Sequence, residues 1–357
     1  MTAPINIIKA EVRALRAYTL EPHRASIKIN QNENPWDAPA EIKEEVLRRF
    51  AAREWSRYPD FVPVGLQEQL ARFAHWKADG VIPGNGSNEL IQAVLMVTVG
   101  PGKRVLISEP TFMLYRQVAT VLGGEVETVL LTPELTYDTA ALLETIAEQQ
   151  PDVTIICSPN NPTGCVINPA DLRRLLKASR GLIVIDEAYH EFARQSVVPL
   201  LHEYENLVVL RTFSKAMAFA ALRIGYLLAA PELVREIGKA VLPYNLNAFS
   251  QIAAEVAIEK YPTLLGPTVE AIIAEKERLY AAVSQIRGLQ PVESSANFMV
   301  VRSDTDPKRI FAELLKRDIL IRDVTGYPML KEYFRFSVGT PAENDRLLSG
   351  LNEIQGK

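Results

Sequence analysis

The chain has 357 residues, with 43 acidic and 39 basic side chains, which gives a formal net charge of -4. In addition, no run of lysine and arginine residues forms the concentrated basic surface of a nucleic-acid-binding protein, so nucleic acid is not expected as a partner. Hydrophobic residues make up 48% and charged residues 23%, so neither disorder nor a fibrous repeat is indicated.

The first 35 residues have no strong strand pattern, and we expect them to form an N-terminal arm and part of a small domain. They lack the basic flank and apolar core of a leader sequence. No stretch of the chain approaches the roughly 18 apolar residues of a membrane span, so no membrane contact is expected. The sequence therefore suggests a cytoplasmic protein.

Residues 36–250 are predicted to form a large α/β domain. A helix that begins near Asp37 would place Ile42, Val46, Leu47 and Phe50 on one face. From about residue 80 to 230, short β-rich runs alternate with helical patterns, which is typical of βαβ units in a mostly parallel sheet. The predicted strands are 105–107, 126–131, 153–157, 182–186, 207–211 and 224–229. The predicted helices between them include one from Ser87 and one capped by Asn168.

Residues 251–357 are predicted to form a smaller C-terminal α/β domain. A long, charged, amphipathic helical stretch covers 250–286. Short apolar runs at 297–301, 319–321 and 333–338 follow, with a helix at 307–317.

Two of the predicted strands are followed by residues suited to an anionic, pyridine-containing ligand. Thr212, Ser214 and Lys215 come directly after 207–211, and Arg223 follows eight residues later. A lysine near cationic groups suits an amine nucleophile beside a phosphate, although this motif alone is better explained by a solvated lysine and a paired arginine. Asp186 ends the apolar strand 182–186, where its carboxylate would either meet a protonated pyridine nitrogen or cap the next helix.

Three loops at the same sheet edge add to this set. Ser158–Gly164 is a rigid, proline-rich loop that would present Asn161, and the glycine-containing 84–89 offers backbone N–H groups of Ser87 and Asn88 to a phosphate. Either Phe112 or Tyr115 would stack on an aromatic ring.

Metal chemistry is not expected. The chain has only two cysteines, Cys157 and Cys165, which provide neither a disulfide framework nor a thiolate zinc site. Its four histidines are scattered, with no i, i+4 pair.

Taken together, the ordered motifs GNGSNE, PTF, SPNNPTG, DEAY, TFSKA and LRIGY resemble those of the fold-type I aminotransferases. The resemblance implies a mostly parallel seven-stranded sheet flanked by helices, a smaller α/β domain, and pyridoxal 5′-phosphate as cofactor. It assigns the Schiff-base lysine to Lys215, the ring-nitrogen carboxylate to Asp186, and the ring 3-oxygen to Asn161 and Tyr189. It assigns the phosphate to Ser87, Asn88, Thr212, Ser214 and Arg223, and the stacking ring to Phe112.

More narrowly, the segments RAY, INQNENP, RYPD, IRD and FRF are similar to those of histidinol-phosphate aminotransferases. That resemblance implies the conversion of histidinol phosphate and 2-oxoglutarate to imidazole acetol phosphate and glutamate in histidine biosynthesis. It also implies a homodimer in which Tyr58 reaches the phosphate of the partner's cofactor. Tyr18, Asn32, Arg322 and Arg335 would bind the substrate.

Several alternatives stay open at this point. An aromatic aminotransferase or a phospho-amino-acid decarboxylase would use the same cofactor residues. A nicotinamide-dependent oxidoreductase would account for Gly84 and Gly86 but would leave Lys215 and Asp186 without roles. A regulatory protein with an idle cofactor site would keep the motifs without turnover.

Overall fold

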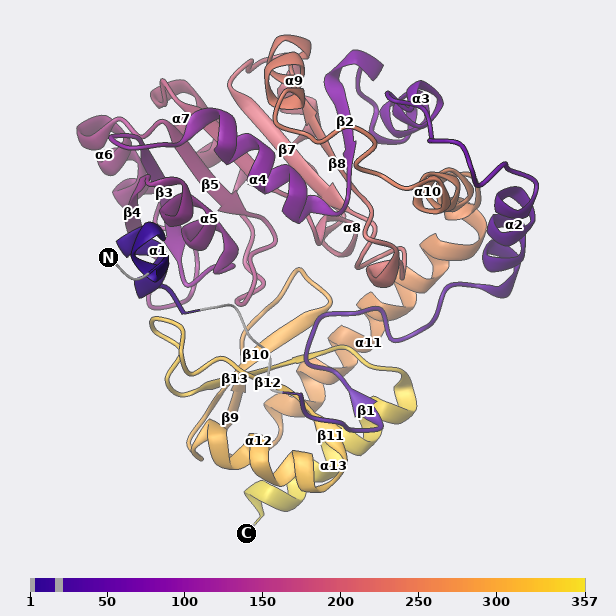
Figure 1. Cartoon of the computed structure of the whole chain (residues 1–357). Coiled ribbons are helices and arrows are strands. Elements are labelled where there is room, and N and C mark those ends of the chain that lie inside the picture. The colour runs from indigo at the N-terminus through magenta and orange to yellow at the C-terminus, as the bar shows by residue number, and fades with distance from the viewer. Residues whose placement is uncertain (1–3, 17–21, 357) are drawn as a thin grey trace.

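The structure, a computed structural model, describes residues 4–16 and 22–356. Helices surround a large twisted sheet in the upper part of Figure 1, and a smaller group of strands and helices lies below it. The chain runs from an N-terminal arm through the large sheet and finishes in the lower group.

The large sheet has seven strands in the order β2-β8-β7-β6-β5-β3-β4. All neighbouring strands pair in parallel except β8, which is antiparallel to both β2 and β7. The mostly parallel seven-stranded sheet predicted from the sequence is therefore confirmed, with one reversed strand. Its strands are β2 (Val81–Gly84), β3 (Arg104–Glu109), β4 (Glu125–Leu130), β5 (Val153–Cys157), β6 (Leu182–Asp186), β7 (Leu207–Thr212) and β8 (Gly225–Ala229).

Both faces of this sheet are covered by helices because its central strands are apolar on both sides. In β7, Val208 and Leu210 pack into the core on one face, and Leu207 and Val209 pack into the core on the other. One face carries α4 (Ser87–Thr98), α5 (Leu114–Leu122) and α9 (Pro231–Gly238). The other carries α3 (Val64–Ala74), α6 (Thr139–Gln149), α7 (Pro169–Ala178) and α10 (Ala248–Lys260). Shorter elements are α8 (His190–Ala193) and the 3₁₀ turns Ala78–Gly80, Val198–His202 and Ala220–Leu222.

Two of the helix predictions, at Asn168 and near Asp37, named individual residues that the structure places. Asn168 caps α7 as expected, because its side chain accepts a hydrogen bond from the Ala170 amide at 2.8 Å. The helix predicted near Asp37 is α2 (Ala40–Ala51), and it buries Ile42 and Val46. Leu47 was wrongly placed on the same face, since it is 57% exposed. Adjacent helix positions differ by about 100°, so the residue after Val46 turns away from the core.

The small domain is formed by the C-terminal third of the chain together with the N-terminal segment that contains Ile27 and Lys28. Its four-stranded antiparallel sheet has the order β12-β13-β10-β9, and β1 pairs in parallel with β11. The elements are β1 (Ile27–Lys28), β9 (Leu289–Pro291), β10 (Phe298–Ser303), α12 (Pro307–Lys316), β11 (Ile319–Leu320), β12 (Arg322–Asp323), β13 (Tyr333–Ser337) and α13 (Pro341–Gln355). The N-terminal segment thus reaches the small domain through a strand pair that the sequence did not predict.

The helical stretch predicted at 250–286 is interrupted. A π-helical turn (Tyr261–Leu265) separates α10 from α11 (Gly266–Ser284). Pro262 has no amide proton for the regular α-helical ladder, so the hydrogen-bonding pattern shifts at this point.

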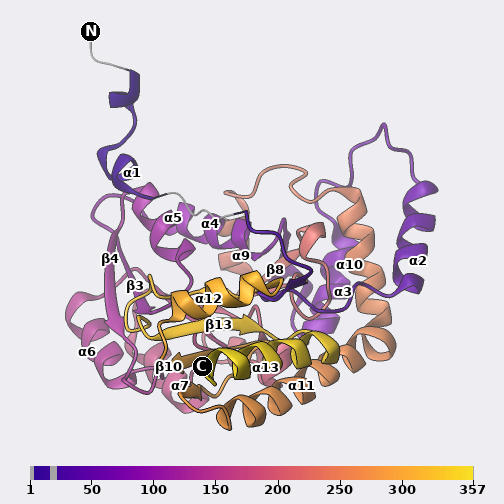
Figure 2. The same ribbon diagram turned by 90° about the horizontal axis from the view of Figure 1, so that it is seen from below.

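The arm begins with a 3₁₀ turn (Pro4–Ile7) and α1 (Ala10–Ala14). Lys9 donates from Nζ to the Val121 carbonyl at 3.0 Å, which holds the arm beside α5. Figure 2 shows the 3₁₀ turn Pro4–Ile7 extending away from the rest of the chain. Among the helices in the described residues, none is long and apolar enough to cross a membrane.

Candidate active site

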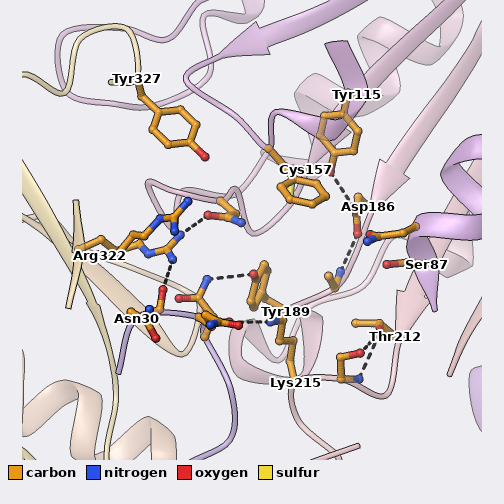
Figure 3. A pocket seen from close by; sticks show the side chains of 18 of the residues that line it. Asn30, Ser87, Tyr115, Cys157, Asp186, Tyr189, Thr212, Lys215, Arg322 and Tyr327 are labelled. Carbon is orange, nitrogen blue, oxygen red and sulfur yellow. Dashed lines mark hydrogen bonds between the residues drawn. The ribbon is translucent and has the colours of Figure 1, made fainter. Parts of the chain in front are cut away.

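A cavity of about 250 Å³ opens at the carboxyl ends of the central strands, between the large sheet and the small domain. Ligands of parallel α/β sheets bind at this edge. In Figure 3, Arg322 and Tyr327 lie on the side of the cavity opposite Ser87 and Thr212. The cavity is lined by Asn30, Gln31, Asn32, Ser87, Asn88, Phe112, Tyr115, Cys157, Asn161, Asp186, Ala188, Tyr189, Thr212, Ser214, Lys215, Arg223, Arg322, Tyr327 and Arg335.

Asp186 is the last residue of β6, and its side chain is 3% exposed. Its Oδ2 accepts a hydrogen bond from the Tyr115 hydroxyl at 2.7 Å, and its Oδ1 accepts one from the Ala188 amide at 3.1 Å. Burial raises the pKa of Asp186 to about 6, against the lowering effect of the Tyr115 hydrogen bond. A buried carboxylate of this kind is suited to a cationic ligand atom.

Lys215 lies three residues beyond the end of β7, and its side chain lines the cavity. Its Nζ donates to the Gln31 carbonyl at 2.9 Å. Burial lowers the pKa of Lys215 to about 8, and the positive charge of Arg335 acts in the same direction. A larger fraction of the amine is therefore neutral, and nucleophilic, at physiological pH than for an exposed lysine.

An anion cradle surrounds the start of α4. Gly86 immediately precedes this helix with a φ of 81°, and a Cβ there would lie 2.4 Å from the Arg223 guanidinium. Only glycine allows the backbone and the arginine to approach so closely. Arg223 donates to the Ser214 hydroxyl at 3.1 Å, and the Thr212 and Ser214 hydroxyls are 3.0 Å apart. A helix N-terminus, hydroxyl groups and a guanidinium together suit a phosphate.

The loop after β5 is held by Asn160 rather than by its neighbour. Asn160 is fully buried; it donates to the Pro110 carbonyl at 2.9 Å and accepts from the Thr111 hydroxyl at 2.8 Å. This leaves Asn161 at the cavity wall, where its Oδ1 accepts from Arg335. Arg335 also donates to the Asn30 carbonyl at 3.0 Å.

Tyr189 is 4% exposed and faces the cavity. Burial raises the pKa of its hydroxyl, which is therefore protonated at neutral pH. The hydroxyl accepts from the Asn32 side-chain amide at 3.0 Å. Asn32, which the resemblance assigned to substrate binding, lines the cavity. Both polar atoms of its side chain are already bonded, because Nδ2 donates to Tyr189 and Oδ1 accepts from Ser337.

The two aromatic candidates differ in their surroundings. The Tyr115 ring is fully buried, and its hydroxyl is bonded to Asp186. Phe112 is only partly buried and meets the Tyr115 ring edge-on, with the centroids 5.6 Å apart. Phe112 thus keeps ring surface at the cavity, whereas Tyr115 is held in the core.

Arg322 and Arg335 are directly opposite each other on the antiparallel strands β12 and β13, and both line the cavity. Two cations in such a pair repel each other. Within the described part of the chain, Arg322 forms no ion pair with a carboxylate. The geometry therefore favours an anion between the two guanidiniums.

Of the predicted site residues, Tyr58 does not line this cavity, and Tyr18 lies outside the described residues. Tyr58 is 76% exposed in the loop between α2 and α3, and its ring stacks on Tyr244 with centroids 4.5 Å apart. Among the described residues there is also no group of three histidine, cysteine or acidic side chains that could hold a metal ion.

Other residues of the site escaped the sequence reasoning. Tyr115 was considered only as a stacking ring, because its bond to Asp186 joins positions 71 residues apart. Gln31 contributes its backbone carbonyl, which accepts a hydrogen bond from Lys215, and a pattern of side chains cannot reveal such a contact. Tyr327 lies in the turn between β12 and β13, and only its position beside the IRD motif was a usable signal.

Comparisons with known proteins agree with this geometry. The family described as aminotransferase class I and II matches residues 24–351. The histidinol-phosphate aminotransferase of Chlorobium phaeovibrioides is 38% identical over 98% of this chain and 97% of its own length. That of Chlorobium phaeobacteroides is 40% identical over 97% of this chain and 96% of its own length.

A solved structure supports the fold. The histidinol-phosphate aminotransferase of Sinorhizobium meliloti, in complex with pyridoxal-5′-phosphate, superposes with a TM-score of 0.88. It covers 97% of both chains at 23% identity. At that identity the similarity shows the shared fold.

Proposed function

Because the chain belongs to the class I and II aminotransferase family, which uses pyridoxal 5′-phosphate, we propose that it transfers the amino group of histidinol phosphate to 2-oxoglutarate. This reaction belongs to histidine biosynthesis. The observation that carries the choice of substrate is the cross-strand pair Arg322 and Arg335 in the cavity wall. The family also decides against the nicotinamide-dependent oxidoreductase, which left Lys215 and Asp186 without roles.

The residues present fit pyridoxal 5′-phosphate. The cradle at Gly86, which a Cβ would fill, would hold the phosphate together with Ser214 and Arg223. Asp186, buried and with a raised pKa, would hold a proton on the ring nitrogen. The partly buried Phe112 would cover one face of the ring.

When bound, the cofactor supplies an electron sink for the negative charge that develops at the substrate Cα. Lys215 would provide the amine that holds the cofactor, and its lowered pKa favours the neutral form that this role requires. The Lys215 Nζ would also be the base that takes the proton from the substrate Cα. Tyr189 and Asn161 would orient the ring through its 3-oxygen.

The arginine pair would select the substrate by charge. A phosphate monoester carries roughly -1.5 to -2 charges at neutral pH and accepts bidentate arginine bonds. Two guanidiniums at one wall match this dianion better than they match a single carboxylate. In the second half-reaction, Arg335 would bind a carboxylate of glutamate or 2-oxoglutarate.

Steady-state kinetics test the proposal. Removing the arginine from a buried pair of arginine and phosphate costs roughly 2–5 kcal/mol. Arg335→Ala should therefore lower kcat/KM for histidinol phosphate by more than about tenfold. The cofactor spectrum should be unchanged. Arg302→Ala is the matched control, because Arg302 belongs to the same small-domain sheet but is exposed and paired with Glu332.

Substrate comparison separates the alternatives. Wild type should strongly prefer histidinol phosphate to histidinol. Equal use of the two amines, or better use of phenylalanine or tyrosine, would replace the proposal with an aromatic aminotransferase. Release of CO2 from a phosphorylated amino acid would instead indicate the decarboxylase.

We also propose that the protein works as a homodimer with shared sites, in the cytoplasm. Tyr58 and its neighbours Trp55 and Phe61 are 76%, 73% and 65% exposed, which is unusual for three aromatic side chains in one loop. A second copy of the chain would cover them. Tyr58 would then reach the phosphate of the partner's cofactor, since it does not line the cavity of its own chain.

Subunit mixing tests this arrangement. A Lys215→Ala chain and a Tyr58→Ala chain should each be impaired alone. In a mixed dimer, one site would carry both changes and the other neither, so activity should recover after the two are refolded together. No recovery in a verified mixed dimer would show that Tyr58 does not act in the partner's site.

A further inference from the structure

We propose that Ser337 is a positioning residue: through Asn32, it directs the hydroxyl proton of Tyr189 toward the ring oxygen of the cofactor. The inference rests on the proposed role of Tyr189 and is independent of the amino donor. It extends the site to the small domain, because Ser337 is the last residue of β13.

Three hydrogen bonds connect these residues in order. The Asn32 backbone amide donates to the Ser337 hydroxyl at 2.8 Å. The Ser337 hydroxyl donates to Asn32 Oδ1 at 3.1 Å. Asn32 Nδ2 then donates to the Tyr189 hydroxyl at 3.0 Å.

The direction of each bond follows from the number of protons available. Ser337 uses a lone pair for the Asn32 backbone amide, and its single proton goes to Oδ1. This bond turns Nδ2 toward Tyr189, and an amide nitrogen can only donate. Tyr189 must therefore accept from Asn32, which leaves its own proton for the cavity. In the reverse orientation, Asn32 Oδ1 would accept from Tyr189 and occupy that proton.

The connection is rigid. Asn32, Tyr189 and Ser337 are 2%, 4% and 1% exposed. Asn32 has a left-handed backbone with φ of 57°, and its carbonyl accepts from Asn297 at 3.2 Å. The Ser337 amide donates to the Ile29 carbonyl at 2.8 Å, so the two segments are fixed to each other on both sides.

The expected effect is on the pH at which the bound cofactor changes its visible absorption. A hydroxyl that donates to the ring oxygen withdraws negative charge from it. Without that donation, the oxygen attracts the proton on the neighbouring Lys215 nitrogen more strongly, and the midpoint moves to higher pH. The other charged or titratable groups around Tyr189 are Arg335, Asp186, Cys157 and Lys215, all of which remain in the variants below.

The experiment measures this midpoint in the cofactor-loaded enzyme without substrate. Tyr189→Phe sets the full effect, about 1 pH unit or more, because it removes a hydrogen bond to a charged group. Ser337→Ala should raise the midpoint by about 0.5 to 1 unit, and Ser337→Thr, which keeps the hydroxyl, should restore it. The double variant should equal Tyr189→Phe. Ser303→Ala is the matched control, since Ser303 is a buried serine of β10 that accepts from the Thr305 amide away from the site.

The outcomes separate the possible failures. No shift in Ser337→Ala, beside a clear shift in Tyr189→Phe, overturns the inference. So does a Ser337→Ala shift that persists in the Tyr189→Phe background, because Ser337 would then act by another route. A shift of equal size in Ser303→Ala assigns the effect to small-domain packing and also overturns it. No shift in Tyr189→Phe means that the proposed role of Tyr189 itself is wrong.

Discussion

Replacing Asp186 by asparagine should change stability in opposite directions with and without the cofactor. In the cofactor-free chain, Asp186 is a buried carboxylate whose hydrogen-bond donors are Tyr115 and the Ala188 amide. An asparagine can keep both contacts: its oxygen accepts from Ala188, and its amide nitrogen donates to the Tyr115 oxygen. The substitution therefore removes the buried charge at little cost in hydrogen bonds.

The size of the effect follows from the pKa of Asp186, which burial raises from 3.8 to about 6. Because this folded-state pKa is raised, the folded chain binds the proton more tightly than the unfolded chain does. The ionised carboxylate consequently destabilises the cofactor-free protein above about pH 6, by about 3 kcal/mol, and the penalty fades as the pH falls toward about 4. Asp186→Asn should therefore raise the free energy of unfolding of the cofactor-free protein by most of this amount at about pH 7.5, and by little at about pH 4.

With the cofactor bound, the sign should reverse. In the role proposed for Asp186, a protonated ring nitrogen would offset the buried charge, and an amide could not favour that protonated form. Asp186→Asn should then bind the cofactor more weakly and lose much of its activity at the proton-abstraction step.

Urea unfolding of both forms, at the two pH values, measures these changes. Asp152→Asn serves as a control of opposite sign, because Asp152 accepts from Lys103 and from the Arg104 amide near the surface and should lose stability when neutralised. The reasoning fails if cofactor-free Asp186→Asn is no more stable than wild type near neutral pH, or if the difference does not depend on pH. Unchanged single-turnover proton abstraction would remove Asp186 from its proposed role.

Two further predictions concern neighbouring residues. Borohydride reduction of the loaded enzyme should attach the cofactor to Lys215, and Lys215→Ala should abolish transamination; peptide mapping that finds another lysine would contradict this assignment. Glu187→Gln should cost about 3–5 kcal/mol in urea unfolding, because it leaves the buried Arg211 without the carboxylate that it contacts at 2.9 Å. A loss below about 1 kcal/mol would mean that this pair is not the clamp between β6 and β7 that its burial suggests.

Local sequence was enough for much of the large domain. The apolar runs at 153–157 and 182–186 coincide with β5 and β6, because strands buried on both faces need continuous hydrophobic side chains. Asp186 ends one such strand and Lys215 lies three residues beyond the end of another, so their arrival at the same sheet edge was predictable. The cap at Asn168 was equally local.

Local patterns could not show direction or exposure. The apolar run of β8 does not reveal that this strand is reversed, since both directions bury the same side chains. Leu47 has an apolar side chain like those of core residues, but it lies on the exposed side of its helix. These features depend on how elements pack, which one segment's pattern does not specify.

The partners within the site were decided by tertiary structure alone. Tyr115 meets Asp186 across 71 residues, and Ser337 meets Asn32 across 305. Such contacts form only when several strands and a second domain have closed around the cavity, so each residue's own neighbours in the chain carry no record of them. The sequence determined which chemical groups reach the sheet edge, and the folded chain determined which group orients which, because hydrogen bonds depend on distances of about 3 Å that separate segments acquire only by packing together.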